Sequence, residues 1–504
     1  MKKYIFSLVC LCCALLPALE GQAALHEHPE YPDLRKSDAN IVGHILDKNT
    51  KEHLPYITVA LKGTTIGTVT DATGHYFLKN LPEGNFVLEV SSVGYKTVRR
   101  NVTLKKGRTL EEDFEIEEDA VALDGVVVTA NRNETARRLA PTLVKVVTPK
   151  LFDMTNSHTL SQGLVFQPGV RVENDCQNCG YSQVRINGMD GKYTQILIDS
   201  RPIFSALAGV YGLEQIPANM IERVEVVRGG GSALFGSSAI AGTVNIITKE
   251  PLRNSGSFAH SISNFDGSGS FDNNTTLNLS LVSSDNKMGA YIYGQNRHRS
   301  AWDSNGDSFS ELPKLKNQTV GVNAYYRLSP YSKLNLEYHH MEEFRRGGNR
   351  FDLPPHIAED ANLNGSGEPG LVEQIEHSIN TGGLKFSAFS KDQKHAFNAY
   401  ASAQHIVRDS YYSAYGHTTD FTGVLGAQYI YHFDKLFFMP SDLTGGVEFN
   451  HDNLDDKATD MQKYRDAALA EDPTAIGDRL QQLIDKYTPC LLYTSPSPRD
   501  RQKS

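Results

Sequence analysis

The stretch IPANMIERVEVVRGGGSALFGSSAIAGTVNIITKE (residues 216–250) predicts two β-strands joined across a glycine-rich turn. Residues 222–228 alternate polar and β-branched side chains, which is typical of a half-buried strand. Three glycines follow at 229–231, and without a Cβ they let the chain turn through positive φ at little steric cost. Residues 232–235, SALF, can form one helical turn with the serine as N-cap. A second strand is predicted over 243–248.

A strand, a glycine turn and a short helix also raise the alternative of a phosphate-binding loop. Gly231 and Gly236 have the four-residue gap of a Walker A loop. The next two residues are Ser237 and Ser238, so the lysine that would neutralise phosphate charge is absent. The stretch therefore argues against nucleotide binding.

The stretch resembles the end of the plug domain of TonB-dependent outer-membrane receptors, which reads much like ERVEVVRG…ALFGS.AI.G.VNIITK. One departure is Ser238, where the family often carries an acidic residue. The segments VRINGM (184–189) and QILIDSRP (195–202) resemble two central strand motifs of the same domain, which we place at 139–251. The motif residues of this chain are Arg185, Asn187, Gly188, Asp199, Glu225, Arg228, Gly229, Gly236 and Gly242.

Composition places limits on the function. The formal net charge is −9 and the isoelectric point is near 6.0, which argues against nucleic acid as the main partner. A hydrophobic content of 39% with 41 glycines fits a mainly β protein. We find neither a nucleophile–base pair nor a metal triad, so we predict no enzymatic activity and no cofactor.

The N-terminus has the features of a secretory signal peptide. Lys2 and Lys3 precede an apolar run over 4–16, and residues 21–23 offer a small-residue cleavage site. The run is too short to cross about 30 Å of hydrocarbon. Since no later apolar run reaches about 18 residues, we expect the exported chain to meet a membrane only as a β-barrel.

Residues 41–117 contain short β-prone segments separated by turn residues, which predicts a small β-sandwich. Within them, TVTDATGHYFLKNLPEGNFVLEVSSVGY resembles the carboxypeptidase-regulatory-like domain found ahead of many Bacteroidetes outer-membrane receptors. The span shows no catalytic constellation, so we interpret it as a passive periplasmic module.

Residues 124–130, DGVVVTA, form an isolated β-prone segment between polar flanks. Such a segment can add to the sheet edge of another protein through backbone hydrogen bonds. In position and sequence it resembles the TonB box, the segment that binds the periplasmic protein TonB. The residues assigned to TonB binding are Asp124, Gly125, Val126, Val127, Val128, Thr129 and Ala130.

Two of the 6 cysteines, Cys176 and Cys179, form a CxxC pair inside the plug candidate. A structural zinc site needs four ligands and no second pair is present. A redox motif needs a thioredoxin-like βαβ setting, which is missing. In an exported chain we favour a local disulfide, with ligand-side metal capture as the alternative.

Residues 257–453 alternate polar and apolar side chains in segments of about ten residues, and their short and long connections also alternate. The alternation of short and long connections is typical of an outer-membrane β-barrel rather than of a soluble sandwich. We expect an outer loop over 454–489. Residues 345–372 form a long polar link that we expect on the outer surface, and its cationic groups, with a plug loop over 203–212, are candidates to bind an anionic ligand. The candidate ligand-binding residues are Tyr211, Arg345, Arg346 and Arg350.

Together these features predict a signal peptide (1–23), a β-sandwich, an α+β plug and the first part of an antiparallel barrel. The resemblance implies energised import of a scarce ligand across the outer membrane, with TonB, membrane lipid and an extracellular metal chelate of the siderophore, haem or cobalamin class as partners. The alternatives are a SusC-like glycan importer and a surface receptor for signalling or adhesion.

The end of the chain breaks the preceding pattern. Barrels of this family have about 22 strands, whereas we count about nine segments here. Residues 490–504, CLLYTSPSPRDRQKS, form a Ser/Pro cluster with a basic end and no terminal aromatic residue. We therefore expect an incomplete barrel followed by a foreign tail.

Overall fold

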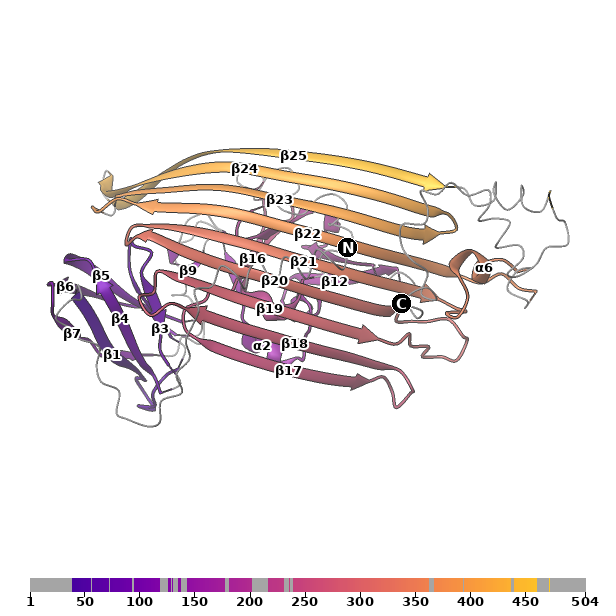
Figure 1. Cartoon of the computed structure of the whole chain (residues 1–504), viewed down its shortest axis with the longest axis horizontal. Coiled ribbons are helices and arrows are strands. Elements are labelled where there is room, and N and C mark those ends of the chain that lie inside the picture. The colour runs from indigo at the N-terminus through magenta and orange to yellow at the C-terminus, as the bar shows by residue number, and fades with distance from the viewer. Residues whose placement is uncertain are drawn as a thin grey trace.

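The computed structural model describes residues 39–117, 126–127, 129, 135–136, 143–201, 216–230, 235–459 and 471, with gaps at 56, 72, 93–94, 177–180, 236–238, 362–366, 393 and 437–438. The predicted signal peptide and the tail at 490–504 lie outside these residues. Figure 1 shows a sandwich at one end, a plug sheet, and a broad wall of long strands. No helix in this described part is long and apolar enough to cross a membrane.

The N-terminal body is a sandwich of two four-stranded sheets, as predicted. One sheet has the order β4-β1-β7, with β8 also paired to β1, and the other has the order β3-β2-β5-β6. Inward side chains such as Ile41, Leu78 and Leu88 are fully buried between them. The strands are β1 (Ala39–Asp47), β2 (Thr58–Leu61), β3 (Gly67–Val69), β4 (His75–Leu81), β5 (Gly84–Ser91), β6 (Val98–Leu104), β7 (Thr109–Glu111) and β8 (Phe114–Ile116).

The plug is built on a sheet of order β11-β15-β16-β14, and β12 and β13 form a separate hairpin. The two strands predicted from the opening stretch are present as β15 and β16, and the structure pairs them antiparallel. The elements are β9 (Val126–Val127), β10 (Thr135–Ala136), β11 (Val144–Val147), α2 (Pro149–Met154), α3 (Leu160–Leu164), β12 (Val170–Cys176), β13 (Tyr181–Ile186), β14 (Thr194–Ile198), β15 (Ile221–Arg228) and β16 (Gly242–Thr248).

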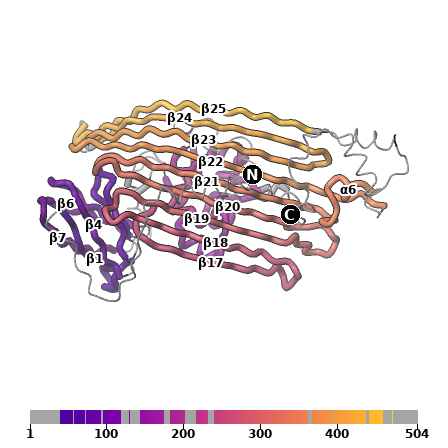
Figure 2. The backbone as a smooth tube through the Cα atoms, viewed as in Figure 1, coloured from indigo at the N-terminus to yellow at the C-terminus, as the bar shows by residue number. Residues whose placement is uncertain are grey.

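Nine antiparallel strands form the wall, each hydrogen-bonded to the next along the chain. Among the described strands no pairing joins β17 to β25, which lie at opposite edges of the wall in Figure 2, so the wall is not closed into a barrel. The strands are β17 (Ser255–Asn264), β18 (Phe271–Val282), β19 (Met288–Arg299), β20 (Lys314–Ser329), β21 (Ser332–Gly348), β22 (Val372–Phe389), β23 (His395–Tyr412), β24 (Tyr415–Leu436) and β25 (Met439–Thr459); α6 (Pro355–Glu359) lies between β21 and β22.

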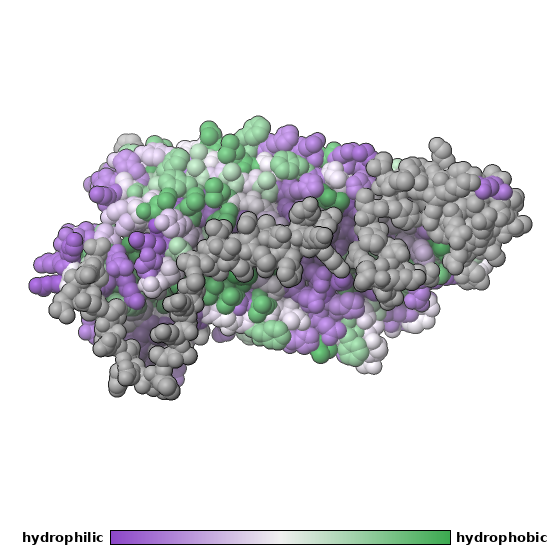
Figure 3. Space-filling view, viewed as in Figure 1, coloured by the Kyte–Doolittle hydropathy of each residue, from purple (hydrophilic) through white to green (hydrophobic). Residues whose placement is uncertain are grey.

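Alternation along the strands gives the wall an apolar outer face. Leu277, Leu279 and Leu281 are 58%, 39% and 40% exposed and share one face, as predicted. Figure 3 shows apolar residues gathered over the upper strands. An apolar outward band is what a strand needs in order to face lipid.

The predicted loop at 454–489 begins too early. The register of β24 with β25 continues through Leu454 to Thr459, so the first six residues of that range are strand. Polar side chains such as Asp452 and Asp456 accept hydrogen bonds from threonines on β24. Since a polar inner face is normal in a barrel, polarity alone was a poor signal for the end of this strand.

The wall supplies part of the plug's hydrophobic core. Tyr291 and Tyr293 of β19 are 6% and 1% exposed and pack with plug residues such as Ile221 and Ile246. The Tyr291 hydroxyl also donates to the backbone oxygen of Asn219, at 2.8 Å. The plug and β19 are therefore joined by apolar burial as well as by hydrogen bonds.

The sandwich is attached to the wall at the turn between β20 and β21. The Thr65 backbone nitrogen donates to the Pro330 oxygen at 3.0 Å. Tyr331, from the same turn, packs against the sandwich core. This turn therefore holds the sandwich at one end of the strands (Figure 1).

Candidate functional site

The predicted TonB-box segment is docked onto the plug through Thr129. This residue is 1% exposed. Its backbone nitrogen and its hydroxyl both donate to Glu225 Oε2, at 2.9 and 2.6 Å. Upstream of it, Val126 and Val127 pair antiparallel with Ala136 and Thr135. The segment is thus held by local pairing and by a buried carboxylate of β15.

Glu225 is an anchor because the plug sheet buries it completely. It is 0% exposed, and its second oxygen accepts a hydrogen bond from Arg223 Nε at 2.9 Å. Asn245, its register partner on β16, donates to the Thr129 hydroxyl at 3.0 Å. Hydrogen bonds to a buried carboxylate are strong and costly to lose, so Thr129 is held on both sides.

From Asn245 the network continues to a tight turn at 198–201. Asn245 accepts from the Ser200 backbone nitrogen at 2.9 Å and donates to the Ser200 hydroxyl at 3.0 Å. Asp199 and Ser200 both have positive φ, at 47° and 66°, which costs backbone energy outside glycine. Asp199 offsets this cost by accepting hydrogen bonds from the Thr248 backbone and hydroxyl, at 3.1 and 2.7 Å.

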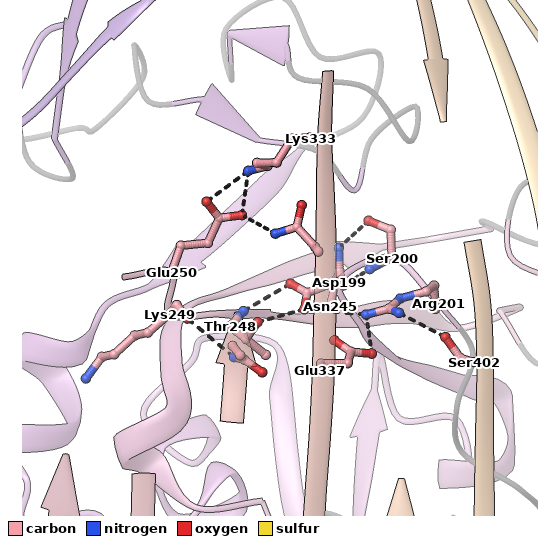
Figure 4. A network of polar contacts seen from close by, with 12 residues as sticks. Asp199, Ser200, Arg201, Asn245, Thr248, Lys249, Glu250, Lys333, Glu337 and Ser402 are labelled. Atoms are coloured by element: carbon pink, nitrogen blue, oxygen red, sulfur yellow. Dashed lines mark hydrogen bonds and ion pairs between the residues drawn. The ribbon is translucent and has the colours of Figure 1, made fainter. Parts of the chain in front are cut away.

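The turn directs Arg201 into the wall, as Figure 4 shows. Arg201 Nη2 lies 2.5 Å from Glu337 Oε1 on β21, and Nη1 donates to the Ser402 hydroxyl on β23 at 2.9 Å. Burial disfavours the charged guanidinium, but attraction to Glu337 and Asp199 outweighs it and raises the pKa of Arg201. The network thus extends from Thr129 across the plug to two strands of the wall.

A second plug–wall ion pair lies in the connection between the last plug strand, β16, and the first wall strand, β17. Glu250 accepts hydrogen bonds from Lys333 Nζ on β21, at 3.0 and 3.1 Å. The charge of Lys333, acting against burial, holds the pKa of the Glu250 carboxyl below its ordinary value. This pair is much more exposed than the Arg201 pair, since the Glu250 side chain is 44% exposed.

The remaining plug-motif residues serve the framework of the plug. Arg185 pairs with Glu173 and Asp190, and Arg228 lies against Gly169. Asn187 and Gly188 have positive φ in the turn after β13, and Gly229 has positive φ after β15. A Cβ on Gly242 would lie 2.4 Å from the Val227 oxygen, so the close pairing of β15 and β16 requires glycine there. Gly236 lies outside the described residues.

The predicted position of the cationic ligand contacts is wrong for two of the arginines. Arg345 and Arg346 belong to β21 rather than to a loop, and they are 1% and 5% exposed. Arg345 pairs with Glu343 at 3.1 Å, and Arg346 donates to the backbone oxygens of Leu353 and Arg350. Arg350 follows the strand and also bonds to backbone. Tyr211 lies outside the described residues.

Cys176, the first residue of the CxxC pair, ends β12. Cys179 lies outside the described residues. We predict that both thiols resist a maleimide in the exported protein until a reductant is added. Because the closed loop is short, the bridge should stabilise the fold by only about 2 kcal/mol. Cys176→Ser should therefore still fold. Free labelling of both thiols without reductant would rule out the disulfide.

Three comparisons place these features among known proteins. Residues 41–128 match the CarboxypepD_reg-like domain, and residues 136–243 match the TonB-dependent Receptor Plug Domain. A vitamin B12 transporter, BtuB, of Vibrio vulnificus is 32% identical over 229 residues, which are 40% of this chain and 37% of that protein. The BtuB of Photobacterium profundum is 36% identical over 133 residues, 26% of this chain and 21% of that protein.

Solved structures share the fold at lower identity. The siderophore receptor PirA of Acinetobacter baumannii has a TM-score of 0.53 and 20% identity, covering 63% of this chain and 49% of its own. The ferripyoverdine receptor of Pseudomonas aeruginosa has a TM-score of 0.53 and 14% identity, covering 68% of this chain and 48% of its own. This chain therefore spans about half the length of these structures and less of its curated relatives.

Proposed function

Because this chain belongs to the TonB-dependent outer-membrane receptors, we propose that it takes part in active import of a scarce ligand across the outer membrane. Its ligand is a metal chelate of the cobalamin or siderophore class. The BtuB relatives by name transport vitamin B12, and two structural neighbours are by title a siderophore receptor and a ferripyoverdine receptor. Energy enters through TonB, which binds residues 124–130.

The docking of Thr129 on Glu225 and Asn245 is the observation that carries this proposal. A TonB-binding segment has to be withheld from TonB in one state and offered in another. Here the residues that withhold it also hold the 198–201 turn, which contacts the wall through Arg201. A ligand that shifts this turn weakens the attachment of Thr129, so occupancy and TonB binding are linked by shared contacts.

The test measures binding of the purified chain to the periplasmic C-terminal domain of TonB by biolayer interferometry. Val127→Pro removes the backbone donor at position 127, and with it one hydrogen bond to an added strand, so binding should weaken about tenfold. The matched control is Ala136→Pro, which disturbs the β9–β10 pairing from the other strand and leaves 124–130 intact. It should keep or improve binding. Equal affinity of Val127→Pro and the unmodified chain would exclude 124–130 as the TonB box.

A further inference from the structure

Three histidines meet at one end of the N-terminal sandwich. His44 lies on β1, His75 is the first residue of β4, and His53 lies in the connection between β1 and β2. The ring centres are 5.2 Å apart for His44 and His53, 5.7 Å for His44 and His75, and 5.1 Å for His53 and His75. All three rings therefore surround one point, although they come from three segments of the chain.

The backbone fixes this proximity. His44 and His75 are direct register partners across β1 and β4, and His53 forms a β-bridge with Leu46. Gly74, with a φ of 76°, lies so close that a Cβ there would be 2.8 Å from the His53 Cβ. A glycine at 74 is thus required for His53 to approach the other two histidines.

Two of the rings present an unprotonated nitrogen. Asp113 Oδ1 accepts a hydrogen bond from the His44 backbone nitrogen at 3.0 Å and also lies 3.0 Å from His44 Nδ1, so its negative charge favours the tautomer with the proton on Nδ1. His75 Nδ1 lies 3.1 Å from the Thr73 hydroxyl, whose single proton is already donated to Asp71 at 2.7 Å. His75 Nδ1 therefore donates its proton to the Thr73 hydroxyl oxygen. In the neutral form of both rings Nε2 carries the lone pair, as in metal-bound histidines supported by a neighbouring carboxylate.

The spacing of the ring centres, though not yet that of the ring nitrogens, fits one tetrahedral ion. With metal–nitrogen distances of about 2.0–2.1 Å, three imidazoles on such an ion have ring centres about 5.2 Å apart. We propose that His44, His53 and His75 bind a divalent transition-metal ion, Zn²⁺ foremost, with the fourth position open to water. Imidazole ligands suit Zn²⁺, Cu²⁺ and Ni²⁺ rather than Ca²⁺ or Mg²⁺.

Binding requires a small rotation of the rings. His53 and His75 stack at an interplanar angle of 28°, so their nitrogens do not yet converge. Both residues are exposed and the His44 side chain is 31% exposed, so each ring can turn without displacing the core. Once bound, the ion would join β1, β4 and the 51–54 segment. It would therefore stabilise the sandwich, since it binds only where the three segments are in place.

Isothermal titration of the purified chain with ZnCl₂ at pH 7.5 tests the site. His53→Ala removes an exposed ligand and should weaken Zn²⁺ binding at least tenfold, while Asp113→Asn removes support for His44 and should weaken it about tenfold. Co²⁺ should give the visible absorption of a tetrahedral nitrogen site in the unmodified chain and not in His53→Ala. Zn²⁺ should also raise the thermal midpoint of the unmodified chain and not that of His53→Ala.

Two controls exclude other cation sites. His451→Asn changes an exposed histidine on β25, and Asp303→Asn disrupts an exposed carboxylate group formed with Asp307 and Glu311. Neither should alter the Zn²⁺ affinity. Unchanged affinity in His53→Ala, or equal loss in His451→Asn, would overturn the metal site. The metal site does not depend on the proposed function. Binding to the TonB domain is measured separately in the same variants, so the failure of one proposal can be told from the failure of the other.

Discussion

Glu225→Ala should release Thr129 from the plug and open residues 124–130 to solvent. The substitution removes the acceptor of both Thr129 hydrogen bonds and leaves Arg223 without the ion pair formed at Oε1. Loss of a buried charged partner costs about 3 kcal/mol. If this energy held the segment closed, a cysteine at position 126 should react with a maleimide about 100-fold faster. The background for this measurement carries Cys176→Ser, Cys179→Ser and Cys490→Ser, so that no native thiol of the exported chain competes for the maleimide.

Two further variants keep this prediction falsifiable if Glu225→Ala disturbs the plug. Thr129→Val removes the hydroxyl but keeps the backbone bond, so it should accelerate labelling in the same direction by a smaller factor. Glu222→Ala changes an exposed carboxylate on the same strand and should leave the rate unchanged. Affinity for the TonB domain should increase as the labelling rate increases, because a larger fraction of the protein then has the segment released and able to bind. Identical rates in Glu225→Ala and Glu222→Ala would show that the carboxylate does not hold the segment.

Arg201→Met should weaken the attachment of the plug to the wall more than substitution of any exposed residue. The arginine side chain is 4% exposed, and the variant leaves Glu337 buried without its cation. Breaking a buried pair from one side costs about 3–5 kcal/mol. We expect the urea concentration at which protease first cleaves the plug to fall accordingly. The double variant Arg201→Met with Glu337→Met should recover most of the loss, because both charges are then gone.

The matched control for Arg201 is Lys333→Met, which breaks the plug–wall pair with Glu250. Since Glu250 is 44% exposed, this pair should contribute less than about 1 kcal/mol. If Lys333→Met and Arg201→Met lowered the urea concentration of first cleavage by similar amounts, burial would not distinguish the contributions of the two ion pairs. If the double Met variant were as unstable as Arg201→Met, the loss could not come from an unpaired Glu337. Other contacts of the arginine side chain would then hold the plug to the wall.

Local sequence patterns predicted the β architecture well. The alternation at 222–228 and 243–248 predicted β15 and β16, and alternation across the barrel region predicted strands with one apolar face. These features depend on neighbouring residues, which a sequence displays directly. The nine strands of the wall also agree with the number of segments counted.

The site itself was only partly predictable. Glu225, Asp199 and Thr129 were named from motifs, but nothing in the sequence placed Thr129 against Glu225, 96 positions later. Arg201 was not singled out, and its partner Glu337 lies in a strand that reads as one of many alternating segments. The polar stretch over 345–372 and the alternation of short and long connections place Arg345 and Arg346 in an outer link, whereas the structure places them in β21. Inside a barrel the polar face points inward, so charge there does not distinguish a strand from a loop.

The attachment of the sandwich to the β20–β21 turn limits how far the proposed TonB-binding segment can move. Glu117 is fixed in the sandwich by the Lys96 backbone and by the Lys48 side chain. Nine residue steps separate it from Val126, and a fully extended chain of that length spans about 30 Å. After release of Thr129, this tether would keep Val126 within that distance of Glu117. If TonB pulls the segment further, we expect the sandwich anchor at Thr65 and Tyr331 to bear the force, so that the N-terminal body limits the travel of the segment.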